Sequence, residues 1–337
     1  MATTVRFLSW NIQDLGKDQV KDAEFIGMIA DVITNETANL VLILETKADQ
    51  GDELGKRVKA VLGANWDHNA SKPKSAPKGT KPENYVFLWN KTVITSATGF
   101  QYPDKQKIGF PNTHLTPKKQ SPSRFPYMGK FKAGATTVQV VAYHAPFNAV
   151  DIPVANQRLA EINEVKSEKE VIVVGDFNDT HQSSKSYSYK GQSTFGPLKA
   201  LKFSAKLKKT KTSLKSAYVI TWANSLDCRS EEYDNFFVKT SGDLTVKSAK
   251  VVDLIVDMTK PNYLHARAKK VFDGWAGRKN AEEAKPAKIK ARKRAKRAPF
   301  VPFVLPVPDR ATFDQAYDAY FRAVSDHLPI LLEVDFK

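Results

Sequence analysis

The sequence predicts an α/β sandwich, because strand-like apolar runs alternate with segments of helical periodicity along a chain of 337 residues. A chain of this length can bury a sizeable core, either as one large domain or as two ordinary ones. With 42% hydrophobic and 26% charged residues, the composition is typical of a soluble globular protein. No internal repeat is visible along the chain.

The expected elements begin with a strand, a helix and a second strand. Residues 5–10 form a short strand-like run, and residues 20–34 carry Phe25, Ile29 and Ile33 at the spacing of one helix face. Residues 39–44 are a continuous apolar run of strand length. Later strands are expected at residues 85–89, 137–143, 170–174, 232–238, 244–256 and 330–336, and a second helix at residues 156–165.

Three stretches rich in basic residues interrupt this pattern, at residues 70–82, 182–226 and 261–310. Residues 182–226 contain nine Lys and no acidic residue, and residues 285–297 contain eight Lys or Arg among thirteen. Such runs usually form solvated loops or disordered arms. We therefore expect a single catalytic domain over residues 1–337, with basic insertions at about 182–226 and 261–310.

The formal net charge of +16 favours the capture of polyanions. Nucleic acid is the first candidate partner, and an anionic membrane surface is the second. No run reaches the roughly 18 apolar residues that span a bilayer, and the first residues show no signal-peptide pattern. The only cysteine, Cys228, leaves no intrachain disulfide and fits a reducing compartment. We expect a cytoplasmic protein, with nuclear targeting by residues 285–297 as an alternative, and nothing indicates an oligomer.

Five short polar clusters lie at the ends of strand-like runs. A strand end delivers a polar side chain to the rim of a sheet while its apolar neighbours stay buried, and α/β folds build their sites at such ends. Each cluster taken alone could equally be a turn. The clusters are Trp10 with Asn11, Glu45, His144, Asp176 with Asn178, and Asp326 with His327.

Taken together, the clusters favour metal-assisted hydrolysis of a phosphodiester. Carboxylate and amide oxygens suit a hard cation such as Mg²⁺, and two imidazoles can move protons near neutral pH. The sequence has no thiolate cluster for a structural zinc ion and no glycine-rich phosphate loop of the GxxxxGK[ST] type. In such a site the metal ion stabilises charge in the transition state while a histidine activates water.

Six motifs resemble those of the endonuclease/exonuclease/phosphatase superfamily, the group of deoxyribonuclease I. They occur in the family's order and span nearly the whole chain, and the combination of GDFN with a C-terminal SDHLP is specific. The resemblance implies a four-layer sandwich, in which two mixed β-sheets pack face to face with helices outside. The motifs are SWN (residues 9–11), LET (44–46), YHAP (143–146), GDFN (175–178), YDNFFV (233–238) and SDHLP (325–329).

Two further segments resemble elements of the family's active site. KPENYVFLW (residues 81–89) is similar to the segment in which deoxyribonuclease I-type enzymes place a glutamate before a strand, here Glu83. SRFPY (residues 123–127) is similar to an Arg-x-Pro element, which implies that Arg124 lies near the scissile phosphate. From the residues alone, Glu83 could instead be a surface charge and Arg124 a structural hydrogen-bond donor.

The resemblance implies a metal site and a phosphate site. Glu45, with help from Asn11, would hold the metal ion, and Asp326 would contribute to a metal site or to positioning. Asp176 and Asn178 would orient the phosphate and the attacking water. Gln precedes the metal-binding Glu in most of the family, whereas this chain has Leu44, so one amide hydrogen bond is expected to be absent.

The resemblance also implies two carboxylate–histidine pairs, His144 with Glu83 and His327 with Asp234. Each carboxylate would fix the tautomer of its imidazole and stabilise the cation formed on protonation. Which histidine acts as acid and which as base stays open. The other histidines lack motif context and are expected to be structural; they are His68, His114, His181 and His265.

His144 and Glu83 favour the deoxyribonuclease I-like branch over exonuclease III-type abasic-site enzymes, which ETK at residues 45–47 also resembles. The chain departs from the motifs of inositol polyphosphate 5-phosphatases and lacks the export signal of secreted sphingomyelinases. We therefore expect an endonuclease that hydrolyses DNA, or RNA, with Mg²⁺, or alternatively Mn²⁺ or Ca²⁺. The alternatives are a non-catalytic nucleic-acid-binding protein on a nuclease fold and a lipid or small-molecule phosphodiesterase. Residues 199–215 could border the substrate groove, and residues 285–297 could grip nucleic acid.

Overall fold

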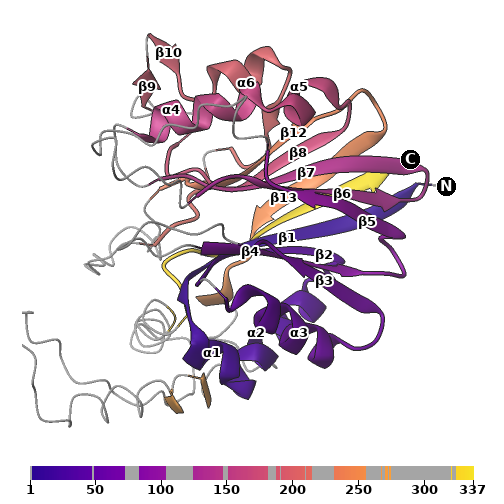
Figure 1. The fold of residues 1–337 in the computed structure, drawn as a ribbon, viewed down its shortest axis with the longest axis vertical. Coiled ribbons are helices and arrows are strands. Elements are labelled where there is room, and N and C mark those ends of the chain that lie inside the picture. The colour runs from indigo at the N-terminus through magenta and orange to yellow at the C-terminus, as the bar shows by residue number, and fades with distance from the viewer. Residues whose placement is uncertain are drawn as a thin grey trace, which may run out of the picture.

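The computed structural model arranges the chain in four layers, with two stacked β-sheets between two layers of helices (Figure 1). This is the predicted sandwich of two mixed sheets flanked by helices. The structure describes residues 2–47, 49–72, 83–103, 124–146, 151–180, 187–189, 191–208, 210–214, 231–255, 267, 270–271, 273–274, 320 and 324–337.

The first sheet has six strands in the order β13-β14-β1-β2-β4-β3. Strands β1 and β2 are parallel and the other neighbours are antiparallel, so the sheet is mixed. Its strands are β1 (Thr3–Leu15), β2 (Leu40–Lys47), β3 (Trp66–Ala70), β4 (Glu83–Asn90), β13 (Leu244–Val251) and β14 (Ile330–Phe336).

The second sheet has six strands in the order β11-β12-β8-β7-β6-β5, in which β7 and β8 form the parallel pair. A two-stranded ribbon of β9 (Ser188–Tyr189) and β10 (Gln192–Ser193) lies apart from it. The strands of the sheet are β5 (Ser96–Gln101), β6 (Tyr127–Ala133), β7 (Thr136–His144), β8 (Val171–Asp176), β11 (Ser204–Ala205) and β12 (Asp234–Lys239).

The central strands are apolar on both faces because both faces are covered. Between the sheets, Phe7 of β1 meets Phe236 of β12 edge to face at 5.5 Å. On the outer face of the first sheet, Leu8 and Trp10 pack with residues of α2. The alternation along β1 therefore sends neighbouring side chains into two different cores.

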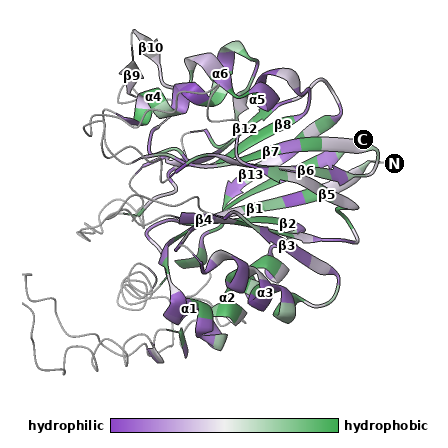
Figure 2. Cartoon of the chain, viewed as in Figure 1, coloured by the Kyte–Doolittle hydropathy of each residue, from purple (hydrophilic) through white to green (hydrophobic). Residues whose placement is uncertain are grey.

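Each outer layer contains short helices (Figures 1 and 2). Helix α2 begins at an N-cap, Asp22, whose carboxylate accepts hydrogen bonds from the amides of Glu24 and Phe25. The helices over the first sheet are α1 (Lys17–Lys21), α2 (Ala23–Asn35) and α3 (Gly51–Leu62), and those over the second are α4 (Asp151–Arg158), α5 (Asn163–Ser167) and α6 (Gly196–Ala200).

Two elements differ from the sequence prediction. The single helix expected at residues 156–165 is broken: α4 ends at Arg158, a 3-10 turn covers Leu159–Glu161, and α5 starts at Asn163. Ile162 lies between them in extended conformation and is fully buried, so packing of its side chain outweighs helical continuity. The strand expected at residues 244–256 ends at Val251.

Residues 182–226 are not simply a solvated loop. Among the described residues, this stretch contributes α6 and the edge strand β11, and it buries Phe195, Leu198 and Leu207. These apolar side chains are buried, whereas Lys199 and Lys202 between them are exposed. Residues 285–297, and most of residues 70–82 and 261–310, lie outside the described residues. Among the helices that the structure describes, none is long and apolar enough to cross a membrane.

Candidate active site

The polar clusters of the sequence meet at one end of the two sheets. His144 is the last residue of β7, Asp176 the last of β8, and Asp234 the first of β12. The strand register pairs Asp176 with His144 on one side and with Asp234 on the other. Asp176 therefore lies at the centre of a row of three ionisable groups that the backbone itself aligns.

Unusual backbone conformations bring the neighbouring groups into this row. Glu45 has a φ of 59° at an irregularity in the β2–β4 pairing, and Asn178 has a φ of 48°. Gly175 has a φ of 141°, and a Cβ there would lie 1.9 Å from the carbonyl oxygen of Tyr143. Only glycine fits at this position, which explains the glycine of GDFN. Backbone strain of this kind is common at functional sites.

Asn11 joins the two sheets through a pair of carboxylates. Its amide nitrogen donates to Glu45 Oε1 at 3.0 Å and to Asp176 Oδ2 at 3.1 Å. Its side-chain oxygen, Oδ1, is buried and has no hydrogen-bond partner among the described residues. Turning the side-chain amide over by 180° would bring Oδ1 to face both carboxylates, and these three groups would then form an oxygen donor set that fits a hard divalent cation. Two groups of described residues could hold a metal ion: Glu45, His144 and Asp176, and Asp176, Asp234 and His327.

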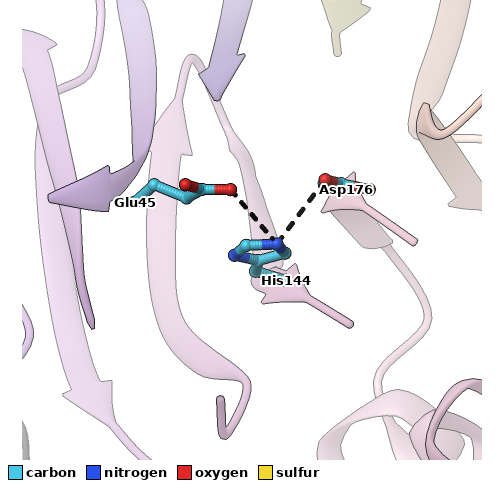
Figure 3. Close-up of side chains that lie close together, drawn as sticks. All are labelled: Glu45, His144 and Asp176. Carbon is cyan, nitrogen blue, oxygen red and sulfur yellow. Dashed lines mark ion pairs between the residues drawn. The ribbon is translucent and has the colours of Figure 1, made fainter. Parts of the chain in front are cut away.

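His144 forms the expected pair with Glu83. Its Nδ1 lies 2.7 Å from Glu83 Oε2, and its Nε2 points toward Glu45 and Asp176, at 3.4 and 3.5 Å (Figure 3). Burial disfavours the charged imidazole and Arg124 repels it, but Glu83 and Glu45 outweigh both and raise the pKa of His144. Burial opposes ionisation of Glu83 as well, yet His144 and Arg124 lower the pKa of this carboxyl to about 2.

His327 forms the second expected pair, with Asp234. Its Nδ1 lies 2.7 Å from Asp234 Oδ2, and its Nε2 lies 3.6 Å from Asp176 Oδ2 and 3.9 Å from Asp326 Oδ1. Burial alone would lower the pKa of His327, but Asp234 and Asp176 raise it well above the ordinary value. The Nε2 atoms of both histidines thus face the same oxygen of Asp176.

Arg124 lies in the site but is already engaged by the protein. Its guanidinium donates to Glu83 Oε1 at 2.9 Å and to the carbonyl oxygen of Ala145 at 2.7 Å. Asn178 donates to the same carbonyl at 3.0 Å, and its backbone amide donates to Asp176 Oδ1 at 2.8 Å. Both residues therefore hold the loop that follows His144, and Arg124 also braces the Glu83 carboxylate.

Asp326 lies at the rim of the cluster. Burial raises the pKa of this carboxyl; His327 lowers it, and Glu45 raises it further. Gln13 donates to Asp326 Oδ2 at 3.0 Å. Gln13 belongs to none of the sequence motifs, although it shares one face of β1 with Asn11 by the two-residue period of a strand.

Several supporting residues could not be identified from motifs. The hydroxyl of Tyr85 accepts a hydrogen bond from the His144 amide at 3.1 Å. The hydroxyl of Tyr320 donates to the carbonyl oxygen of His327 at 2.6 Å and accepts from the Trp10 indole at 3.2 Å. Trp10, in the SWN motif, thus acts on the site through a residue 310 positions away.

Part of the predicted border segment, residues 199–215, contacts the second histidine pair. We call residues 204–208 and 210–214 the lysine strap. The hydroxyl of Thr212 in the strap accepts from the Asp234 amide at 2.9 Å, and Ser213 forms a β-bridge with His327. Asn235 fixes the other end, because its side chain accepts from the Lys206 and Leu207 amides. The strap therefore lies directly beside the His327–Asp234 pair. Of the histidines expected to be structural, His68 lies on β3, 3.2 Å from Asp52, and the other three lie outside the described residues.

Comparison with known proteins agrees with the overall fold. No curated protein matches the sequence. The endonuclease/exonuclease/phosphatase from Bacteroides vulgatus superposes with a TM-score of 0.55 at 14% identity, covering 99% of this chain and 100% of that chain. D. rerio TDP2 complexed with single strand DNA product gives 0.51 at 10% identity, covering 98% of each chain.

A mannosyl-6-phosphatase from Bacteroides thetaiotaomicron VPI-5482 gives a TM-score of 0.52 at 13% identity, covering 98% of this chain and 99% of that chain. At such identities the likeness shows a shared fold alone. A model of one family, however, matches residues 8–327, which include all ten predicted site residues. The chain belongs to the Endonuclease/Exonuclease/phosphatase family.

Proposed function

We propose that this protein is a metal-dependent phosphodiesterase that cuts nucleic acid internally, with DNA as the first candidate substrate. The observation that carries the proposal is the convergence of two carboxylate-backed imidazoles on Asp176, with Nε2 atoms 3.5 and 3.6 Å from the same oxygen. A group that gives a proton and a group that takes one are what in-line hydrolysis of a phosphodiester needs. We further propose that the whole chain acts as one catalytic domain.

Glu45, Asn11 and Asp176 would hold the metal ion, with Asp326 at the edge of the same cluster. Within the described part of the chain, Asn11 Oδ1 is buried without a hydrogen-bond partner, which is costly. Turning the amide over would bring this oxygen to face Glu45 and Asp176, where it would bind the ion. Oxygen donors favour Mg²⁺, with Mn²⁺ and Ca²⁺ as alternatives. When bound, such an ion stabilises negative charge on a phosphoryl oxygen.

The chain's own side chains would then perform the proton transfers. One imidazole takes the proton of the attacking water, and the other gives a proton to the leaving oxygen. Glu83 and Asp234 hold the Nδ1 atoms, so each Nε2 faces the reacting groups. Asn178 would orient the phosphate. Arg124 would contribute positive charge beside it while bracing Glu83.

The charge of the strap supports nucleic acid as the substrate. Lys206, Lys208 and Lys211 lie on a segment that is fixed at both ends, next to the His327–Asp234 pair. Lysines in such a position would neutralise phosphates without reading base sequence. The net charge of +16 also favours the binding of a polyanion such as nucleic acid. Nucleic acid also accords with the TDP2 neighbour, whose structure contains a single strand DNA product.

The mannosyl-6-phosphatase neighbour is a reason to test small phosphate esters as well. We propose an assay of plasmid nicking, RNA cleavage and hydrolysis of bis(p-nitrophenyl) phosphate, each with Mg²⁺ and with excess chelator. A nuclease cuts plasmid or RNA in Mg²⁺ alone. Hydrolysis of the small ester without cleavage of either polymer would identify a small-molecule or lipid phosphodiesterase. Binding of polymer without any hydrolysis would identify a non-catalytic nucleic-acid-binding protein.

A further inference from the structure

Tyr187 combines an exposed ring with a firmly held backbone. Its side chain is one of two large apolar side chains that are exposed among the described residues, at 38%. Its amide donates to Asp179 Oδ1 at 3.3 Å, and its carbonyl oxygen accepts from the amide and hydroxyl of Thr194 at 3.1 and 2.5 Å. Asp179 and Thr194 are themselves buried. A rigid support for an exposed aromatic ring is typical of a ligand-stacking residue.

Tyr233 places a second ring beside His327. It is half-buried, immediately precedes Asp234, and its carbonyl oxygen accepts from the Phe177 amide at 2.9 Å. Its ring centroid lies 6.5 Å from that of His327, at an interplanar angle of 33°. Asp179 holds the backbone of Tyr187, and its neighbour Thr180 donates its hydroxyl to Oε2 of Glu232, the residue before Tyr233, at 3.1 Å. The two tyrosines are therefore attached to neighbouring segments of backbone.

The lysine strap runs beside Tyr233. The amides of Thr212 and Ser213 donate to the carbonyl oxygen of Glu231, two residues before Tyr233, at 2.8 and 3.1 Å. Cationic side chains for a phosphate backbone and flat rings for bases therefore flank the same end of β12. Proteins that bind single-stranded nucleic acid combine these two features.

We propose that Tyr187 and Tyr233 form a stacking subsite for nucleobases next to the scissile phosphate, and that the substrate is single-stranded at this point. The proposal rests on the proposed function and narrows its substrate class. Stacking on the two rings requires an unstacked base. A continuous duplex presents such a base only after a base pair has been opened, which costs free energy. Every base has a flat face, so the subsite would be tolerant of sequence.

The test compares binding of two fluorescent single-stranded DNA 12-mers by anisotropy in excess chelator, which blocks metal-dependent cleavage. One 12-mer carries bases throughout, and the other has abasic tetrahydrofuran units at its six central positions. The variants are Tyr187→Ala, Tyr233→Ala and the two Tyr→Phe substitutions. Val61→Ala, at the other exposed apolar side chain, on α3, is the matched control.

We expect each Ala variant to bind the base-containing 12-mer roughly 5- to 150-fold more weakly, the range for loss of one base–aromatic stack. Binding of the abasic 12-mer should not change, and each Phe variant should bind like the wild type because the ring is retained. Val61→Ala should bind both oligonucleotides as the wild type does. Equal losses on both oligonucleotides, or no loss on either, would overturn the stacking subsite.

The stacking subsite and the nuclease activity can fail separately. If the wild type cleaves plasmid or RNA in Mg²⁺ but the Ala variants bind like the wild type, the protein is a nuclease without this stacking subsite. A wild type that binds neither 12-mer and hydrolyses only bis(p-nitrophenyl) phosphate would overturn both the subsite and the nucleic-acid substrate. A base-dependent loss with the Ala variants supports the subsite whatever the cleavage rate.

Discussion

Replacing Glu83 with Gln tests the electrostatic coupling that holds the first histidine. Glu83 contacts His144 at 2.7 Å and Arg124 at 2.9 Å, and its side chain is 18% exposed. These partners lower the pKa of Glu83 from 4.5 to about 2 despite its burial. A difference of about 2.5 pH units at about 1.4 kcal/mol per unit corresponds to about 3 kcal/mol of stability at neutral pH.

The sign of the pH dependence follows from the lowered pKa. The folded state holds the Glu83 proton less tightly than the unfolded chain does, so the stabilisation is fully present above the unfolded pKa of about 4.5. It is lost as the pH falls toward about 2. Glu83→Gln should therefore lower the free energy of unfolding by up to about 3 kcal/mol at pH 7, and by less than half of that at pH 3.

The measurement is urea-induced unfolding of the wild type and Glu83→Gln at pH 7 and pH 3. Glu53→Gln is the matched control, because it breaks an exposed ion pair with Arg57 that should contribute less than about 1 kcal/mol. A loss for Glu83→Gln that is the same at both pH values would refute the electrostatic account. It would show that the residue acts only through its shape and hydrogen bonding.

Four other outcomes are expected. Glu45→Gln, like excess chelator, should remove most hydrolysis without unfolding the protein; full activity in chelator would exclude a metal mechanism. His144→Ala and His327→Ala should each lower turnover by about 10²–10⁴-fold, and the double variant should lose less than the product of both; a folded His327→Ala variant with wild-type turnover would contradict its role. Gly175→Ala should reduce the free energy of unfolding by at least about 1–3 kcal/mol in urea titrations, because its φ of 141° suits only glycine; an unchanged midpoint would count against the strain. Replacing the basic residues of 285–297 with Gln should make the slope of log K against log salt concentration shallower, by about 0.9 per lost phosphate contact on duplex DNA or about 0.7 on single strands. Saturated cleavage rates should stay the same; an unchanged slope would mean that this run does not touch nucleic acid.

The sequence determined the strands of the central layers and the residue types of the site. Continuous apolar runs mark β2, β4, β7 and β8, because strands covered on both faces have no polar side to interrupt them. Sparser patterns were missed: α3 buries few apolar side chains, Leu54 and Val58 among them, and β6 interrupts its buried residues with Lys130 and Lys132. The GDFN motif could be recognised because it reflects local backbone geometry: Gly175 and Asn178 both have a positive φ.

Only the tertiary structure decided how the site is assembled. Asn11 meets Asp176 across 165 residues of chain, and Asp176 lies between His144 and Asp234 because of strand register. Register depends on pairing between distant strands, which no local pattern specifies. Long-range packing likewise decides the contact of Arg124 with Glu83, which joins residues 41 positions apart. Residue identity fixed which chemistry is available, and long-range packing fixed which atoms face one another.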